Sequence, residues 1–220
     1  MSISIAPAQR DDLSAIAEIN RRAYGEELVT RFAFTQEPDS KTMHEFFKAR
    51  IASRFDDART AIFKATDDAT GEVLGFACWT LEAVDEAVPP PTGKLVQDRD
   101  SAPRFMDLEF VMAAGKVVEA LGRHRKAETH YYLSAFAVDP SRQGQGIGTR
   151  LLRHCLRLAD RASLPSWLIS LPGSHSLYAR EGFVDVDSAD IDLNAWDKSR
   201  HRGYGIYRQY AMVRRPLEAA

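Results

Sequence analysis

The chain has few of the features that would tie it to a metal, an oxidising compartment, nucleic acid or a bilayer. Its two cysteines, Cys78 and Cys155, cannot build a disulfide framework, and no Cys/His cluster has the spacing of zinc ligands. The formal net charge is only -2, which gives no electrostatic reason to bind nucleic acid. No apolar run approaches the roughly 20 residues that a membrane helix needs, and residues 1–7 alternate like a strand instead of resembling a signal peptide. These absences favour a soluble, cytoplasmic protein without a metal.

The composition is that of an ordinary globular domain. Hydrophobic residues make up 45% of the 220 residues and charged residues 27%, which suffices for one sizeable core. From about residue 83 to 129 the regular pattern breaks, and Pro89, Pro90 and Pro91 can neither join a sheet nor continue a helix. We therefore expect one domain over 1–220 with an insertion at about 83–129. The insertion is either a lid or a linker, and its length favours a lid.

The N-terminal half predicts a strand, two helices and a hairpin. Residues 2–6 form the strand, and Asp11 or Asp12 is placed to cap a helix with apolar residues on one face, Leu13, Ile16, Ala17 and Ile19. A second helix over Thr42 to Phe55 turns four residues inward, Met43, Phe46, Phe47 and Ile51. Strands at 59–65 and 72–81 flank a turn at 67–71 and predict the hairpin.

The C-terminal half alternates strands with helices. A helix is expected at about 103–121, a largely apolar strand of the fully buried type at 131–138, and a helix at 147–161. The inner residues of that last helix are Ile147, Leu151, Leu152, Cys155, Leu156 and Ala159. A buried strand at 166–171, a short helix at 175–180 and strands at about 183–193 and 204–214 complete an α/β or α+β domain.

The most informative segment is a glycine-rich turn between the strand at 131–138 and the helix at 147–161. It reads Asp139-Pro140-Ser141-Arg142-Gln143-Gly144-Gln145-Gly146-Ile147-Gly148-Thr149. Glycine permits positive φ and lets a ligand approach the backbone without meeting a Cβ. The unpaired N–H groups of the first helical turn lie at the positive end of the helix dipole, so a turn of this kind binds phosphate oxygens.

Three phosphate-binding motifs compete for this turn with a plain strand-to-helix connection. A P-loop would need a Lys-Ser/Thr pair after its last glycine, where this chain has Thr149-Arg150. A dinucleotide site needs G-x-G-x-x-G and a later carboxylate, but the spacing here is G-x-G-x-G and the strand at 166–171 offers none. A plain turn seldom uses three alternating glycines. The third motif, Q/R-x-x-G-x-G/A of the GNAT superfamily of acyl-CoA-dependent N-acetyltransferases, resembles this segment position for position.

The resemblance covers the C-terminal half closely and the N-terminal half only in its order of elements. After the turn, the helix and the next strand comes Leu177-Tyr178-Ala179-Arg180-Glu181-Gly182-Phe183, which is similar to the superfamily signature L-Y-x-x-x-G-F. Many relatives carry Asn seven positions and Ala four positions before this tyrosine, where this chain has Leu171 and Ser174. Ser170 or Ser174 would then supply the hydrogen bonds near pantetheine.

The resemblance implies the fold and the cofactor site. The fold is α/β (α+β), with a mixed, mostly antiparallel central sheet, helices on both faces and a splay between the fourth and fifth strands. Pantetheine pairs with the exposed strand edge in such a sheet, and a backbone N–H polarises the thioester carbonyl. The residues expected to bind acetyl-CoA are Phe136, Ala137, Val138, Arg142, Gln143, Gly144, Gln145, Gly146, Ile147, Gly148, Thr149 and Ser174.

The implied chemistry is direct attack of an amine on the thioester inside a ternary complex. The resemblance makes Tyr178 the general acid, and its ordinary pKa of about 10 keeps it protonated at neutral pH. Packing under the sheet is its alternative role. The base is not identified: relatives often place Glu where this chain has Ser134, and a water chain competes with four side chains, Glu109, Glu128, His130 and His175. Both cysteines fit buried structural positions, which disfavours a covalent acyl-enzyme.

The sequence does not identify the acceptor amine. Its pocket is expected from the first two helices, the hairpin and the insertion. Five aromatic residues are either walls of that pocket or part of the core, and the core is the favoured role for each: Tyr24, Phe32, Phe34, Trp79 and Trp196. A basic stripe on the helix at 147–161 is either a solvated face or a contact for the phosphates of CoA, and it consists of Arg150, Arg153, His154, Arg157 and Arg161. We expect an acetyltransferase acting on a small-molecule amine in preference to a protein, as a monomer or homodimer. A non-catalytic acyl-CoA-binding or sensing domain is the rival, which the presence of Tyr178 disfavours.

Overall fold

The computed structural model describes residues 2–34, 38–84, 103–124, 128–198 and 203–217. Within these residues, seven strands form one sheet in the order β1-β2-β3-β4-β5-β7-β6. Neighbouring strands run antiparallel except β4 and β5, which are parallel. The expected mixed, mostly antiparallel sheet is confirmed.

The N-terminal half supplies three strands and the helices of one face. Its elements are β1 (Ile3–Pro7), the 3₁₀ turn η1 (Arg10–Asp12), α1 (Leu13–Gly25), α2 (Leu28–Phe32), α3 (Ser40–Phe55), β2 (Thr60–Asp67) and β3 (Val73–Glu82). β2 and β3 form the predicted hairpin, with Ala65 opposite Gly75. The turn between them holds Gly71 at a φ of 74°.

The C-terminal half contains the glycine-rich turn and the remaining strands. Its elements are α4 (Leu108–Gly122), β4 (His130–Val138), η3 (Pro140–Arg142), α5 (Ile147–Arg161), β5 (Ser166–Ser170), η4 (Pro172–Ser174), α6 (His175–Arg180), β6 (Val184–Asp192), α7 (Leu193–Trp196) and β7 (Ile206–Arg214). The triproline segment at 89–91, like the rest of 85–102 in the expected insertion, lies outside the described residues.

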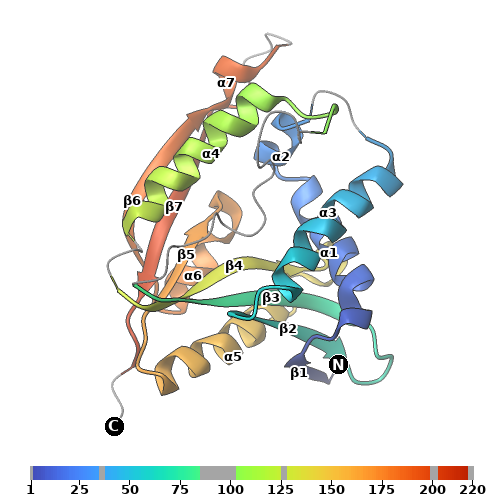
Figure 1. The fold of residues 1–220 in the computed structure, drawn as a ribbon, viewed down its shortest axis with the longest axis vertical. Coiled ribbons are helices and arrows are strands. Elements are labelled where there is room, and N and C mark those ends of the chain that lie inside the picture. The colour runs from blue at the N-terminus through green and yellow to red at the C-terminus, as the bar shows by residue number, and fades with distance from the viewer. Residues whose placement is uncertain (1, 35–37, 85–102, 125–127, 199–202, 218–220) are drawn as a thin grey trace.

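Helices cover both faces of the sheet, as Figure 1 shows. Ala77 and Trp79 of β3 pack with α5 and α6 on one face. Phe76 and Cys78, which alternate with them along the strand, pack with α1 and α3 on the other. A third cluster of buried residues joins α2, α4 and α7 to β6 and β7. The glycine-rich turn connects β4, in the sheet, to α5, which packs on the first of these two faces.

The amphipathic pattern of α5 predicts both its bounds and its buried face. The helix runs from Ile147 to Arg161 as expected, and all six residues assigned to its inner side are buried: Ile147, Leu151, Leu152, Cys155, Leu156 and Ala159. Spacings of three and four residues place them on one stripe against the sheet. This packing fixes the position of the glycine-rich turn that precedes the helix.

The predicted capping of α1 is wrong. Asp12 occupies the N-cap position, but its side chain makes no capping hydrogen bond there. Its carboxylate instead accepts from the Gln9 N–H at 2.7 Å and from Lys64 Nζ at 2.6 Å. The 3₁₀ turn η1 ends at Asp12, directly before α1 begins at Leu13, so the Asp12 side chain stabilises this turn instead of capping the helix.

Other differences concern short helices and helix starts. α2 and α7 were not expected, because 5 and 4 residues are too short to show a helical period. α4 begins at Leu108 instead of 103, since Asp107 caps it by accepting from the Phe110 N–H at 3.2 Å. Phe46, expected to be buried on α3, is only partly buried and packs edge-on against Phe34 at 6.1 Å.

The sheet is splayed between β4 and β5, as expected. β4 pairs with β3 along most of its length, but with β5 only at Tyr131 and Tyr132. β4 is therefore not the fully buried strand that its apolar sequence predicts. Its residues from Ser134 to Phe136 stay partly exposed, because β5 has separated from β4 at that point.

Candidate active site

The open stretch of β4 presents main-chain groups away from β3. The Asp139 N–H donates to the Leu74 carbonyl at 2.9 Å, so alternate residues of β4 point their main chain toward β3. Phe136 and Val138 then point theirs into the splay. Their carbonyls accept there from the Tyr24 hydroxyl at 3.1 Å and from the Gln143 amide at 3.2 Å, respectively. The corresponding N–H groups face the same opening, so an extended ligand can pair with this edge.

The glycine-rich turn is shaped for close approach of a ligand to its backbone. Gly144 and Gly146 adopt φ of 75° and 77°, a left-handed conformation that favours glycine. Both are exposed, and a Cβ built on either would meet no atom within 4 Å. Gly146 is the N-cap of α5, so the free N–H groups of the first helical turn follow it directly. The turn can therefore hold an anionic group such as a pyrophosphate.

The longer side chains of the turn brace it against its neighbours. Arg142 pairs with Glu72 in the β2–β3 turn at 2.9 Å. Asp139 accepts from the Ser141 N–H at 2.8 Å and forms an ion pair with Arg22 of α1. The Gln143 amide, as noted, holds the end of β4. The expected cofactor residues Arg142 and Gln143 thus act on the loop conformation through these contacts.

Gly148, Phe136 and Tyr178 come together from α5, β4 and α6. A Cβ on Gly148 would lie 3.4 Å from the Phe136 ring, so glycine lets the helix sit close to the strand. The rings of Phe136 and Tyr178 are 6.2 Å apart, and Tyr178 also contacts Phe183 at 5.9 Å. The structure therefore places the signature tyrosine beside the open edge of β4.

Tyr178 is buried, which determines its protonation. Burial raises the pKa of its phenol well above the ordinary value, and the nearby Tyr24 hydroxyl acts in the same direction. A hydrogen bond with the Ser174 side chain opposes the shift only in part. Ser174 thus lies next to the tyrosine. The phenol carries its proton throughout the neutral range.

A second tyrosine, partly buried, links this region to α2. Tyr24 interacts electrostatically with Tyr178 and also with Tyr207 of β7. The Tyr207 hydroxyl donates to Glu27 Oε2 at 2.9 Å, and burial together with the Glu27 charge raises the pKa of Tyr207. Glu27 was not singled out in the sequence. Its only signal there is a pair of acidic residues, Glu26 and Glu27, directly after Gly25.

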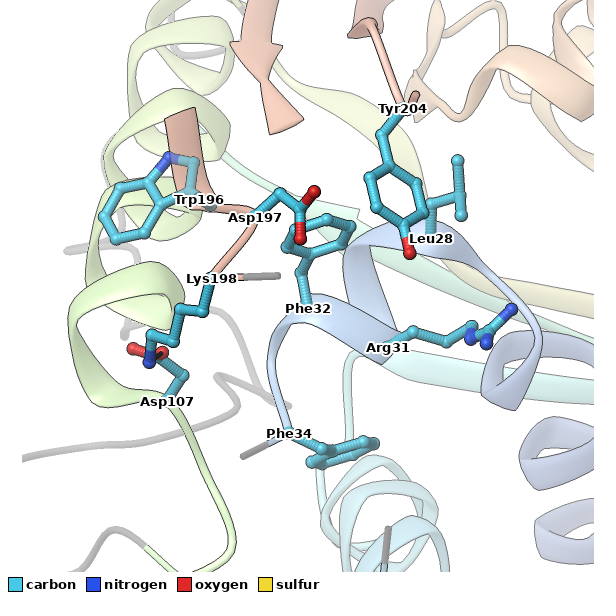
Figure 2. A pocket seen from close by; sticks show the side chains of 9 residues that line it. All are labelled: Leu28, Arg31, Phe32, Phe34, Asp107, Trp196, Asp197, Lys198 and Tyr204. Atoms are coloured by element: carbon cyan, nitrogen blue, oxygen red, sulfur yellow. Dashed lines mark hydrogen bonds and ion pairs between the residues drawn. The ribbon is translucent and has the colours of Figure 1, made fainter. Parts of the chain in front are cut away.

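A cavity of about 310 Å³ with several aromatic side chains in its walls lies beside α2, and Figure 2 shows the residues that line it. Its walls come from α2, the start of α4, α7 and the segment before β7, and they are Leu28, Arg31, Phe32, Phe34, Asp107, Trp196, Asp197, Lys198 and Tyr204. Phe32 and Tyr204 meet edge-on at 4.9 Å, and Lys198 pairs with Asp107 across one side.

Three of the five aromatic residues expected to line an acceptor pocket do line this cavity: Phe32, Phe34 and Trp196. The other two lie elsewhere. Tyr24 contacts β4 through its hydroxyl. Trp79 is a core residue, 1% exposed and stacked on Tyr131 at 5.6 Å, which is the alternative role expected for it.

Each of the four base candidates interacts with a group other than Tyr178. Glu128 pairs with Arg215 at 2.6 Å, and His175 pairs with Asp185 at 2.8 Å. His130 is buried at the start of β4, with a ring nitrogen 3.2 Å from Glu82. Glu109 lies in the first turn of α4, close enough to Lys198 to affect it electrostatically.

Ser134, at the position where relatives often carry Glu, is held by a buried arginine. Arg54 of α3 donates to the Ser134 hydroxyl at 3.4 Å and to its carbonyl at 3.1 Å. Both cysteines are buried, and burial raises the pKa of the Cys78 thiol to about 11. Burial also raises the pKa of Cys155. Neither thiol is therefore poised as a nucleophile.

The basic stripe of α5 is partly used by the protein itself. Arg150 donates to the Ile3 carbonyl at 2.8 Å, and Arg153 forms a two-pronged ion pair with Glu181 at 2.8 and 2.9 Å. His154 packs on the Phe63 ring at 4.7 Å. These contacts favour a surface face over a phosphate site for this part of the stripe.

The described residues contain no group of three or more His, Cys, Asp or Glu side chains that could hold a metal ion. In the same part of the chain, no helix is both long and apolar enough to cross a membrane.

A comparison with protein families matches residues 15–183 to the model described as the acetyltransferase (GNAT) family. Among curated proteins, an 87-residue segment is 34% identical to the [citrate [pro-3S]-lyase] ligase of Klebsiella pneumoniae, and the match covers 38% of this chain. The matched segment spans only 25% of that relative. Nothing about the activity of that ligase follows for this chain.

Solved structures share the fold along nearly the whole chain. One is the histone acetyltransferase HPA2 and related acetyltransferase from Corynebacterium glutamicum, with a TM-score of 0.64, 22% identity and coverage of 100% of this chain and 99% of that one. Another is the putative arylalkylamine N-acetyltransferase 7 of the mosquito Aedes aegypti, with a TM-score of 0.65, 15% identity and coverage of 97% and 87%. At these identities the likeness concerns the fold alone.

Proposed function

The chain belongs to the acetyltransferase (GNAT) family, and from this premise we propose that it transfers an acetyl group from acetyl-CoA to the amine of a small molecule. The observation that carries the proposal is the meeting of three features: the open edge of β4, the glycine N-terminus of α5 and the buried Tyr178 beside both. Acetyl-CoA supplies the activated thioester. The remaining steps belong to residues of this chain.

Binding uses main-chain groups. The N–H groups at the start of α5, from Ile147 to Thr149, receive the pyrophosphate, because Gly144 and Gly146 leave the approach open. Phe136 and Val138 offer main-chain groups to the pantetheine arm along the splay. An N–H of the same strand polarises the thioester carbonyl as negative charge develops on its oxygen. The open edge and the turn thus fit the two ends of the cofactor.

The transfer forms a C–N bond and breaks the C–S bond. The amine nitrogen attacks the thioester carbonyl, and the sulfur leaves with the electron pair of the C–S bond. Tyr178 gives its phenolic proton to that sulfur and is reprotonated from solvent. Its raised pKa keeps this proton in place at neutral pH, and its place beside Phe136 puts it near the proposed path of the pantetheine.

The amine must also lose a proton, and we propose Glu27 as its acceptor. Glu27 is a carboxylate on the α2 side of the tyrosine cluster, held by the Tyr207 hydroxyl at 2.9 Å. Tyr207 and Tyr178 both interact electrostatically with Tyr24, so Tyr24 connects the proposed acid with the tyrosine that holds the proposed base. The aromatic cavity next to α2 then offers space for the body of the acceptor. Within the expected insertion, Asp107 at the start of α4 lines this cavity, so a described part of 83–129 borders the proposed approach.

A coupled assay tests the proposal. The protein is incubated with acetyl-CoA and a mixed panel of amines, CoA release is followed, and products are identified by mass spectrometry. We expect an N-acetylated product whose formation requires both substrates. Binding of acetyl-CoA without transfer to any amine would instead support an acyl-CoA-binding or sensing domain. Stabilisation by NAD but not by acetyl-CoA in a thermal-shift screen would contradict both.

A further inference from the structure

Arg54 of α3 lies beside the open stretch of β4 and Arg50 one helical turn before it, and neither has a carboxylate partner among the described residues. Arg54 is only 4% exposed. Its guanidinium donates to the Arg50 carbonyl at 2.7 Å and to the oxygens of Ser134 at 3.4 and 3.1 Å. All three acceptors are neutral, whereas buried charges in proteins are normally paired with an opposite charge.

Arg50 has even fewer partners. Its Nε atom is buried without a hydrogen bond, while the residue as a whole stays partly exposed. The guanidinium lies over the rings of Phe46 and Phe47, at 5.9 and 5.8 Å. Burial and the positive charge of Arg54 lower the pKa of Arg50 to about 10. The fold therefore keeps two like charges together without neutralising either, which is costly unless a ligand does so.

The arginines are close to the place proposed for the reaction. Arg54 holds Ser134 of β4. Arg50 interacts electrostatically with Tyr24, whose hydroxyl contacts Phe136 on the same strand. The Arg54 guanidinium thus borders the stretch of β4 at which the thioester is expected, and Arg50 lies one helical turn before it on α3. The phosphates of CoA are assigned to the N-terminus of α5, so they do not account for this positive charge.

We propose that Arg50, supported by Arg54, binds a carboxylate of the acceptor, which makes the acceptor an amine that also carries a carboxylate, such as an amino acid. A guanidinium can grip a carboxylate with two parallel hydrogen bonds, which fixes its orientation as well as its position. The inference rests on the proposed acetyl transfer and adds the class of the acceptor. Arg50 is here a binding residue, and Arg54 positions it and the strand.

The experiment compares each free amino acid with its carboxamide as acceptor, with acetyl-CoA as donor and CoA release as readout. We expect the acids to have at least about ten times the kcat/KM of the amides, as loss of a charge-assisted hydrogen bond implies. Arg50→Gln should remove this preference by raising KM for the acid. Arg50→Lys keeps the positive charge but cannot form the two parallel hydrogen bonds of a guanidinium, so it should retain only part of the preference for the acid. Arg208→Gln, at an exposed ion pair with Asp190, is the matched control and should behave as wild type.

Several results would overturn the inference. Equal turnover of acids and amides, or an unchanged ratio in Arg50→Gln, would show that no carboxylate binds at Arg50. Acetylation of tryptamine but of no amino acid would also contradict carboxylate binding at Arg50, while it would still support the proposed acetyl transfer. A preference for succinyl-CoA that Arg50→Gln abolishes would assign the carboxylate to the acyl group instead. Failure to bind acetyl-CoA would refute the proposed function itself, as would the absence of any acetylated product.

A stability measurement separates binding from a structural role. If Arg50 is kept for a ligand, Arg50→Gln should leave the melting temperature of the free protein unchanged or raise it, because a like-charge contact disappears. Addition of the preferred acid and CoA should stabilise the wild type more than the variant. A marked fall in the melting temperature of free Arg50→Gln would instead identify Arg50 as a structural residue and contradict the inference.

Discussion

Substitution of Gly146 by alanine isolates the role of the glycine-rich turn. Gly146 has φ 77° and ψ 4°, and a Cβ at this position would meet no atom within 4 Å. The folded protein therefore suffers no clash, and the cost is that of a left-handed conformation, about 1–2 kcal/mol. For a protein of this size each kcal/mol lowers the melting temperature by about 2–4 °C, so a fall of about 2–8 °C is expected.

The effect on CoA binding should be separate and larger. The new methyl group would project into the space through which a pyrophosphate reaches the N–H groups at the start of α5. A hydrogen bond to a charged group contributes about 1.5–3 kcal/mol, so the loss of one weakens binding by about 10- to 100-fold. Gly146→Val, with a branched side chain, should weaken binding further.

Isothermal titration with CoA measures this effect, and Gly205→Ala provides the control. Gly205 also has a positive φ, 69°, and open space around its Cβ position, but it lies just before β7. Its alanine variant should lose similar stability and bind CoA as the wild type does. Equal affinities in Gly146→Ala and Gly205→Ala would refute the placement of the phosphates at α5.

Three further predictions concern buried groups. Tyr178→Phe should lower turnover by about 10²- to 10⁴-fold with little change in acetyl-CoA affinity, measured on an accepted amine under conditions where chemistry limits the rate; wild-type turnover would leave Tyr178 as a packing residue. Because burial raises the pKa of Tyr178, the wild type should lose stability as pH rises above about 10, where the unfolded phenol ionises first. Chemical denaturation at several pH values should show that the free energy of unfolding falls less steeply above about pH 10 in Tyr178→Phe than in the wild type. The same pH dependence in both proteins would contradict this assignment. Both cysteines should resist Ellman's reagent at about pH 8 until the protein unfolds, since burial raises the pKa of Cys78 to about 11; rapid labelling of the native protein would disprove it.

The parts of the fold that the sequence predicts are those with a strong local pattern. α5 matches to the residue because its apolar positions recur at helical spacing and a glycine precedes it. The β2–β3 hairpin follows from two strands around a turn that ends in Gly71. The helix α6 and the strand β5 are also found where expected. In each case, neighbours in the sequence carry most of the information.

The parts that could not be predicted depend on contacts between distant residues. Asp12 stands where a capping residue is expected, but its carboxylate accepts hydrogen bonds from Lys64 of β2 and from the Gln9 N–H in the preceding turn. The exposure of mid-β4 arises because β5 diverges after Tyr132, which the apolar sequence of β4 alone does not reveal.

The same limit applies to the acceptor side of the candidate site. Arg50 and Arg54 are four residues apart on α3 and look in sequence like ordinary surface cations. Only the packing of α3 onto β4 reveals that Arg54 is buried and that Arg50 Nε has no partner. Glu27 becomes a candidate through Tyr207, which lies 180 residues away in the chain. No spacing rule connects such pairs.

A crystal structure of the protein with acetyl-CoA tests the central claim most directly. The account predicts the pyrophosphate on the N–H groups that follow Gly146, the pantetheine along Phe136 to Val138 in the splay, and the sulfur within hydrogen-bonding distance of the Tyr178 hydroxyl. A cofactor bound outside the splay, or a sulfur far from Tyr178 with the acetyl group pointing away from β4, would contradict it.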